Sequence, residues 1–190
     1  MTGLRPARQA DAALLARLSD MADEGLPRLF WQNDARPDHD IWAVGRDSFL
    51  RLLETDPPGQ MLLTDSGLAP TGGVWTYPMT DPGDPEAGDI PDLAPLRRLK
   101  AHVSGQWYID FLAVLPEHRG RGLGRRLLTG ALDAARSAGA ARIGLIALDS
   151  NATAQALYTT AGFVTVASEP LLNDRWKTGA RMAQLMTRAL

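Results

Sequence analysis

Apolar residues recur along this chain in two periods, which predicts strands and helices in alternation. Helical spacing predicts helices over residues 8–22, 25–32, 40–54, 93–101, 123–135 and 151–161. Alternation or a short apolar run predicts strands over residues 3–7, 59–65, 71–79, 105–115, 142–148 and 163–169. Residues 80–95 are rich in Pro, Gly and Asp and predict a loop, whereas residues 180–190 fit either a strand or a helix.

The order of these elements indicates a single α/β domain. No repeat and no linker divides the sequence. A chain of 190 residues is long enough for one buried core and too short for two comfortable domains. We therefore predict one domain over residues 1–190.

Composition narrows the classes of partner. Hydrophobic residues make up 45% and charged residues 22%, as in soluble globular proteins. A net charge of −2 argues against a nucleic-acid or membrane partner. The sequence contains no cysteine, which excludes disulfides and a cysteine nucleophile, and the histidines lack ligand spacing, so no metal is expected. The first residues lack the apolar run of a signal peptide and no run reaches membrane-spanning length, which predicts a cytoplasmic protein.

The stretch "RGRGLG", residues 119–124, carries the strongest chemical signal. The preceding strand stops at Pro116, and helical periodicity begins at Leu123, so the glycines lie at a strand-to-helix turn. The first backbone N–H groups of a helix have no internal partner, and with the helix dipole they form an anion site. Glycine permits close approach of a phosphate, and Arg119, Arg121 and Arg125 add positive charge and forked hydrogen bonds. This turn therefore predicts a phosphate-bearing ligand.

Two common phosphate motifs fit this turn poorly. A P-loop requires Gly-Lys-Ser/Thr after its glycines, and the turn offers Gly-Arg-Arg. A dinucleotide-binding fold places G-x-G-x-x-G near its first strand, whereas this run is G-x-G-x-G and lies past mid-chain. A tight turn that uses glycine for its geometry alone stays open as an alternative.

The pattern Arg119-x-x-Gly122-x-Gly124 resembles the Q/R-x-x-G-x-G/A pyrophosphate loop of the GNAT superfamily of acetyl-CoA-dependent N-acetyltransferases. The later stretch "NATAQALYTTAGFV" resembles the downstream N-x-x-A-x-x-L-Y-x-x-x-G-F segment of that family, and close resemblance covers about residues 107–166. It implies a mixed, mostly antiparallel central sheet flanked by helices, of the α+β type. Its two central strands would splay apart, and acetyl-CoA would lie in the resulting cleft.

The resemblance also implies roles for individual residues. The backbone of three strand residues would bond the pantetheine arm: Leu112, Ala113 and Val114. The turn and the helix start would hold the pyrophosphate: Arg119, Gly120, Arg121, Gly122, Leu123, Gly124 and Arg125. Asn151 and Ala154 would contact the cofactor, and Tyr158 would direct its hydroxyl at the thioester sulfur.

The chemistry of acetyl transfer needs a base, because an acceptor amine is mostly protonated at neutral pH. Asp110 is the candidate, since it shares one strand face with Tyr108 and Leu112 and a carboxylate in an apolar strand is costly unless used or paired. A bridging water could assist this short side chain. A structural carboxylate bonded to a loop amide or an arginine stays open as the alternative.

Together these features predict an N-acetyltransferase that moves an acetyl group from acetyl-CoA to a primary amine. Without cysteine, direct attack in a ternary complex is favoured, with Tyr158 as the acid for the departing thiolate. The alternative is a non-catalytic acyl-CoA-binding sensor or interaction module. The acceptor would be a small-molecule or peptide amine, and a homodimer stays open.

Overall fold

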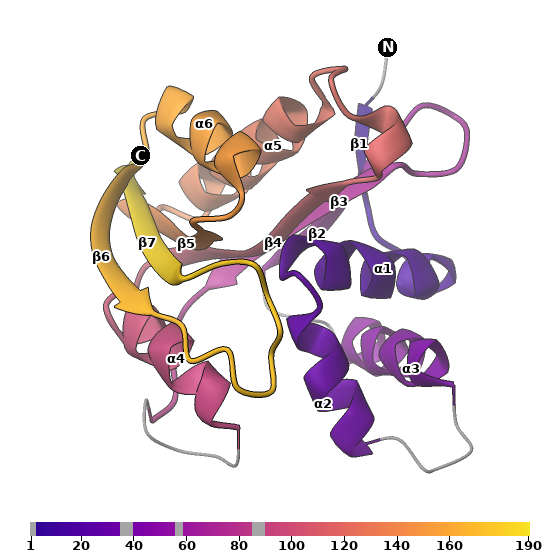
Figure 1. Cartoon of the computed structure of the whole chain (residues 1–190). Coiled ribbons are helices and arrows are strands. Elements are labelled where there is room, and N and C mark those ends of the chain that lie inside the picture. Colours follow the sequence, from indigo (N-terminus) through magenta and orange to yellow (C-terminus); the bar gives the residue numbers. More distant parts are fainter. Residues whose placement is uncertain (1–2, 35–39, 56–58, 85–89) are drawn as a thin grey trace. The chain divides into compact units, whose positions relative to one another are not determined.

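The structure is a computed structural model that describes residues 3–34, 40–55, 59–84 and 90–190 (Figure 1). Its helices are α1 (Ala12–Ala22), α2 (Leu26–Asp34), α3 (Ile41–Glu54), α4 (Ala94–Ala101), α5 (Leu123–Ser137) and α6 (Ala152–Thr160). Its strands are β1 (Gly3–Pro6), β2 (Gln60–Asp65), β3 (Gly72–Pro78), β4 (Trp107–Val114), β5 (Arg142–Leu148), β6 (Val164–Pro170) and β7 (Met182–Ala189). They form a seven-stranded sheet in the order β1-β2-β3-β4-β5-β7-β6.

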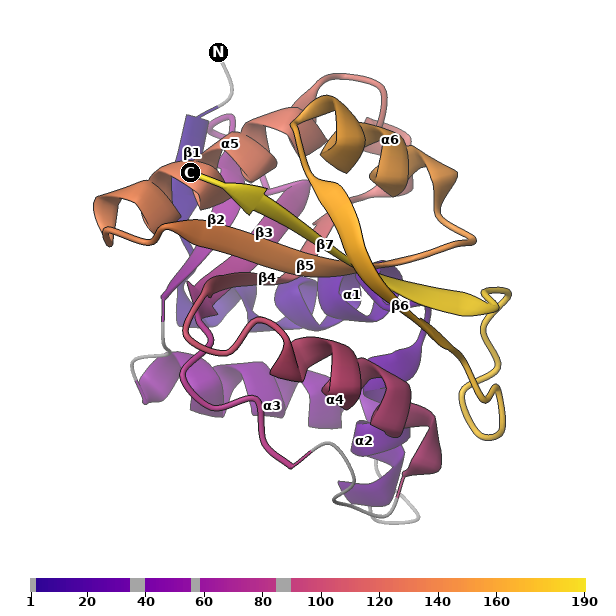
Figure 2. The same cartoon turned by 90° about the vertical axis from the view of Figure 1, so that its left-hand side faces the viewer.

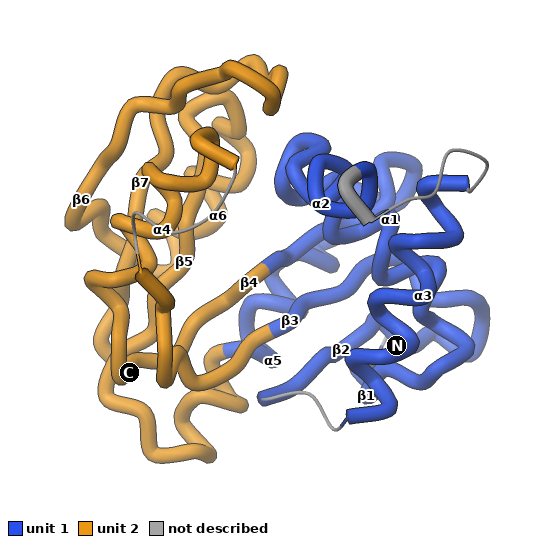
Figure 3. Tube along the Cα trace, turned by 90° about the horizontal axis from the view of Figure 1, so that it is seen from below, with its two compact units in different colours: residues 1–75, 111–131 blue, residues 76–110, 132–190 orange. Residues whose placement is uncertain are grey.

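The chain divides into two compact units, coloured separately in Figure 3. Unit 1 comprises Met1–Trp75 and Phe111–Ala131, and unit 2 comprises Thr76–Asp110 and Leu132–Leu190. The divisions fall inside β3, β4 and α5, so each of these elements contributes residues to both units. The prediction of one domain stays a prediction.

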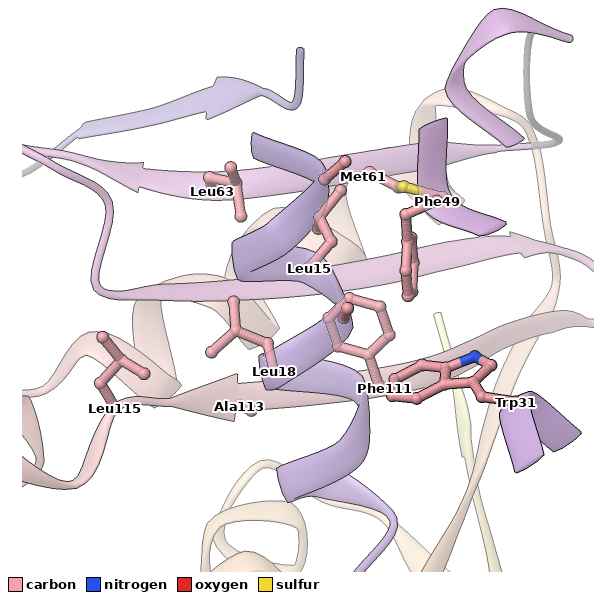
Figure 4. Close-up of a cluster of buried hydrophobic side chains, with 11 residues drawn as sticks. Leu15, Leu18, Trp31, Phe49, Met61, Leu63, Phe111, Ala113 and Leu115 are labelled. Carbon is pink, nitrogen blue, oxygen red and sulfur yellow. The ribbon is translucent and has the colours of Figure 1, made fainter. Parts of the chain in front are cut away.

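Unit 1 is organised around an apolar cluster on α1, α3 and the neighbouring strands (Figure 4). β1 pairs antiparallel with β2, from Gly3 opposite Asp65 to Pro6 opposite Leu62. The cluster contains Leu15, Leu18, Trp31, Phe49, Met61, Leu63, Phe111, Ala113 and Leu115. Phe111 and Ala113, at alternate positions of β4, direct their side chains into this core, because successive strand residues face opposite sides.

Unit 2 contains the mixed part of the sheet. β4 runs parallel to β5 over Trp107–Ile109, and β5 pairs antiparallel with β7 along its full length. β6 pairs antiparallel with β7, with an irregularity between Thr165 and Ala167. Helices α4 and α6 lie on opposite faces of these strands (Figure 2).

The predicted mixed, mostly antiparallel sheet with flanking helices is confirmed. The sequence of residues 180–190 fits either a strand or a helix, and pairing with both β5 and β6 makes Met182–Ala189 a strand. The predicted first helix opens with a 3-10 turn, Gln9–Asp11. Residues 85–89 of the predicted loop lie outside the described residues. The splaying of the two central strands stays a prediction.

No described helix combines the length and the apolarity needed to cross a membrane. The cytoplasmic location stays a prediction.

Candidate active site

The glycine turn in unit 1 has the backbone that its sequence suggested. Gly120 and Gly122 have φ angles of 72° and 76°, in the left-handed region that favours glycine. A Cβ placed on either residue would have no described heavy atom within 4 Å. These glycines are therefore needed for the backbone conformation, and the side on which a Cβ would project is open.

The turn leads directly into α5, a helix of 15 residues. The apolar face of α5, whose residues recur at the helical spacing, is buried: Leu123, Leu127, Leu128, Ala131, Leu132 and Ala135. Arg121 and Arg125 are exposed on the turn and the first helical turn. Three features that favour an anion therefore lie together at the start of α5: the open glycines, two exposed guanidinium groups and the positive end of the helix dipole.

Arg119 ties the turn to the end of β4. Its Nε donates a hydrogen bond to the carbonyl oxygen of Val114 at 3.1 Å. The strand end is also fixed from β3, since a Cβ on Gly72 would lie 2.8 Å from the carbonyl oxygen of Ala113. The strand residues Leu112–Val114, the turn and the start of α5 thus belong to one continuous stretch of unit 1.

Three predicted site residues lie on or beside α6 in unit 2. Asn151 is the N-cap of this helix, and its Oδ1 accepts a hydrogen bond from the N–H of Ala154 at 3.0 Å. This bond explains the asparagine, because the side chain of an N-cap residue accepts a hydrogen bond from an unpaired N–H of the first helical turn. Tyr158 is 7% exposed, and its ring centroid lies 5.9 Å from that of Phe163. The contacts predicted between these residues and the cofactor stay predictions.

Asp110 lies in the unit 2 part of β4 and has two side-chain partners. Its Oδ1 accepts a hydrogen bond from the Tyr77 hydroxyl at 2.9 Å and lies 3.5 Å from Lys100 Nζ. Lys100 Nζ also stands 5.2 Å from the centroid of the Tyr108 ring. The partners are thus a tyrosine and a lysine, where the structural alternative expected a loop amide or an arginine.

The sequence interpretation missed Tyr77 and Lys100. They precede Asp110 by 33 and 10 positions and reach it from β3 and α4. No periodicity or spacing links residues so separated, since tertiary packing alone brings them together. Within the described part of the chain, no group of three or more His, Cys, Asp or Glu side chains could hold a metal ion.

Comparison with known proteins gives a family match. The family model described as "Acetyltransferase (GNAT) family" matches residues 26–163. A mycothiol acetyltransferase from Beutenbergia cavernae is 45% identical over 65 residues, which are 34% of this chain and 21% of that protein. The match thus spans about a fifth of the length of that curated relative.

Solved structures share the fold at low sequence identity. A GCN5-related N-acetyltransferase from Kribbella flavida has a TM-score of 0.66 and 19% identity, over 100% of this chain and 98% of that one. A putative acetyltransferase from Salmonella typhimurium, solved with acetyl-CoA, has a TM-score of 0.63 and 19% identity, over 100% and 94% of the two chains.

Proposed function

Because the chain belongs to the acetyltransferase (GNAT) family, we propose that it is an acetyl-CoA-dependent N-acetyltransferase that acts on a primary amine. The observation that carries the proposal is the open glycine turn at the start of α5, which lies inside the matched region. What distinguishes this turn is that its open glycines lie beside two exposed arginines at the N-terminus of a long helix, a combination that favours an anionic ligand.

The turn suits the pyrophosphate of acetyl-CoA on three grounds. Gly120 and Gly122 leave room for phosphate oxygens to approach the backbone, because neither a Cβ nor a described neighbour fills that space. The N-terminal N–H groups of α5 are donors for an anion. Arg121 and Arg125 are exposed and supply charge, whereas Arg119 holds the turn against Val114.

The remaining roles follow the same reaction. Backbone groups of Leu112, Ala113 and Val114 would bond the pantetheine arm as an added strand would. The amine nitrogen attacks the thioester carbonyl and loses a proton to Asp110, directly or through a water. Collapse of the tetrahedral intermediate breaks the C–S bond, and Tyr158 gives its proton to the sulfur of CoA. The products are the acetylated amine and CoA.

The acceptor belongs to the class of primary amines, on a small molecule or a peptide. The match to the mycothiol acetyltransferase covers too little of that protein to carry its acceptor over to this chain.

The test is release of CoA from acetyl-CoA in the presence of an amine panel, with the acetylated product identified by mass spectrometry. We expect turnover on at least one amine, and Tyr158→Phe should lower kcat roughly 10²–10⁴-fold while acetyl-CoA binding is retained, because the ring stays and the acid is lost. Binding of acetyl-CoA without turnover on any amine would instead support the non-catalytic sensor.

A further inference from the structure

The two carboxylate oxygens of Asp110 have different surroundings. Both described partners, the Tyr77 hydroxyl and Lys100 Nζ, contact Oδ1. No donor among residues 3–34, 40–55, 59–84 and 90–190 bonds Oδ2. The side chain is 20% exposed, so it is neither sealed in the core nor free at the surface. One oxygen is therefore held, and the other is available.

The partners of Asp110 are themselves held in place. Lys100 Nζ lies 5.2 Å from the Tyr108 ring centroid, within the range of a cation–π interaction. The rings of Tyr77 and Tyr108 have centroids 6.0 Å apart and an interplanar angle of 59°. Tyr77 on β3, Lys100 on α4 and Tyr108 on β4 are the titratable groups that these contacts gather around Asp110. Aromatic packing thus restricts the rotamers of both donors.

We propose that Tyr77 and Lys100 are positioning residues for acetyl transfer: they hold Oδ1 of Asp110 and leave Oδ2 to take the proton from the acceptor amine. Two donors from different elements fix the orientation of the carboxylate, so that Oδ2 keeps a lone pair for the proton of the amine. In the step, an N–H bond of the attacking amine breaks and an O–H bond forms at Oδ2. This inference rests on the proposed function.

A purely structural role for the same contacts predicts a different outcome. If Lys100 and Tyr77 only fastened α4 and β3 to β4, their loss would lower the stability of the fold and leave kcat of the folded enzyme unchanged. The two roles are therefore separated by rates measured on folded variants rather than by stability.

The experiment compares Tyr77→Phe and Lys100→Met, alone and combined with Asp110→Asn. We expect each single variant to lower kcat roughly tenfold, as loss of a hydrogen bond to a charged group implies, with KM for acetyl-CoA within about twofold of wild type. Lys100→Arg should restore most of the rate because it returns the charge. In the Asp110→Asn background the same substitutions should change kcat by less than about twofold.

Lys177→Met is the matched control, since it removes a lysine charge from an exposed position of the same unit. Its kcat should equal that of wild type. A normal kcat in folded Tyr77→Phe and Lys100→Met, with Asp110→Asn impaired, would overturn this inference and leave the proposed function intact. Absence of turnover by the wild type on every amine would overturn the proposed function and the inference together.

Discussion

Two aspartates of unit 2, Asp92 and Asp110, are bonded in contrasting ways. Asp92 is 1% exposed, and its oxygens accept hydrogen bonds from the backbone N–H groups of Asp174, Arg175 and Trp176 at 2.8, 2.8 and 3.3 Å. Asp110 is partly exposed and uses one oxygen, with side-chain donors only. A buried carboxylate whose two oxygens are both engaged holds the fold together, whereas an open oxygen is free for chemistry.

The glycines of unit 1 show the same contrast between closed and open surroundings. A Cβ on Gly45 would lie 2.8 Å from the Trp31 ring, and one on Gly72 would lie 2.8 Å from the carbonyl oxygen of Ala113. A Cβ on Gly120 or Gly122 would meet nothing described within 4 Å. The first pair is required by packing between elements, and the second pair leaves room that a ligand can use.

The largest expected effect is on catalysis, at the open carboxylate. Asp110→Asn keeps the shape of the side chain and an oxygen for the Tyr77 hydroxyl, yet it removes the base. We expect kcat to fall roughly 10²–10⁴-fold, measured by CoA release at saturating acetyl-CoA, with little change in unfolding free energy. A rate within threefold of wild type would show that the open oxygen takes no proton.

The next effect is on stability, at the closed carboxylate. Asp92→Ala would leave three backbone N–H groups without their acceptor, and we expect a loss of about 3 kcal/mol in unfolding free energy, measured by urea denaturation. The control Asp174→Ala removes an exposed carboxylate from the same segment and should cost less than about 0.5 kcal/mol. Equal unfolding free energies of the two variants would show that the buried Asp92 stabilises the fold no more than an exposed aspartate does.

A smaller effect is expected at the open glycines, where Gly139 provides a control with a φ of 73° and equally open surroundings. Gly122→Ala and Gly139→Ala should each cost about 1 kcal/mol of stability, because alanine is strained at positive φ. Only Gly122→Ala should weaken acetyl-CoA binding, roughly tenfold by calorimetry. Equal affinities of the two variants would remove the phosphate interpretation of the turn.

The smallest effect concerns a largely shielded ion pair in unit 1, between Arg5 and Asp11. Two hydrogen bonds of 2.8 Å from the Arg5 guanidinium lower the pKa of Asp11 below its ordinary 3.8. A lowered pKa means that the pair stabilises the fold fully above that ordinary value and loses this contribution as the pH falls further. Arg5→Met should therefore lower Tm at pH near 7 and change it less at pH near 2. A Tm difference that is constant with pH would contradict this ion pair.

The features that the sequence predicted correctly are local. The buried face of α5 follows from apolar residues three and four positions apart, and the turn at Gly120 and Gly122 follows from glycines at a strand-to-helix junction. In both cases the residues that form the pattern are also the residues whose structure it predicts. Such features are encoded by neighbours in the chain.

The features that the sequence did not predict depend on distant partners. Asp92 lies in a stretch interpreted as a loop. Its carboxylate oxygens accept hydrogen bonds from the backbone N–H groups of residues 82 to 84 positions further on. Tyr77 and Lys100 meet at Asp110 only because the tertiary fold brings one residue of β3 and one of α4 within reach of this strand position. The final segment also needed its pairing with β5 and β6 before strand could be distinguished from helix. Tertiary packing decides these cases, and one sequence alone does not reveal it.

The most direct test of the central claim, that the glycine turn holds the pyrophosphate of acetyl-CoA, is a calorimetric comparison of acetyl-CoA with S-acetylpantetheine, which lacks the pyrophosphate. We expect wild type to bind acetyl-CoA far more tightly. Gly122→Ala should lose roughly tenfold in affinity for acetyl-CoA and none for S-acetylpantetheine. If the variant loses equal affinity for both ligands, or for neither, the turn does not bind the pyrophosphate and the claim is wrong.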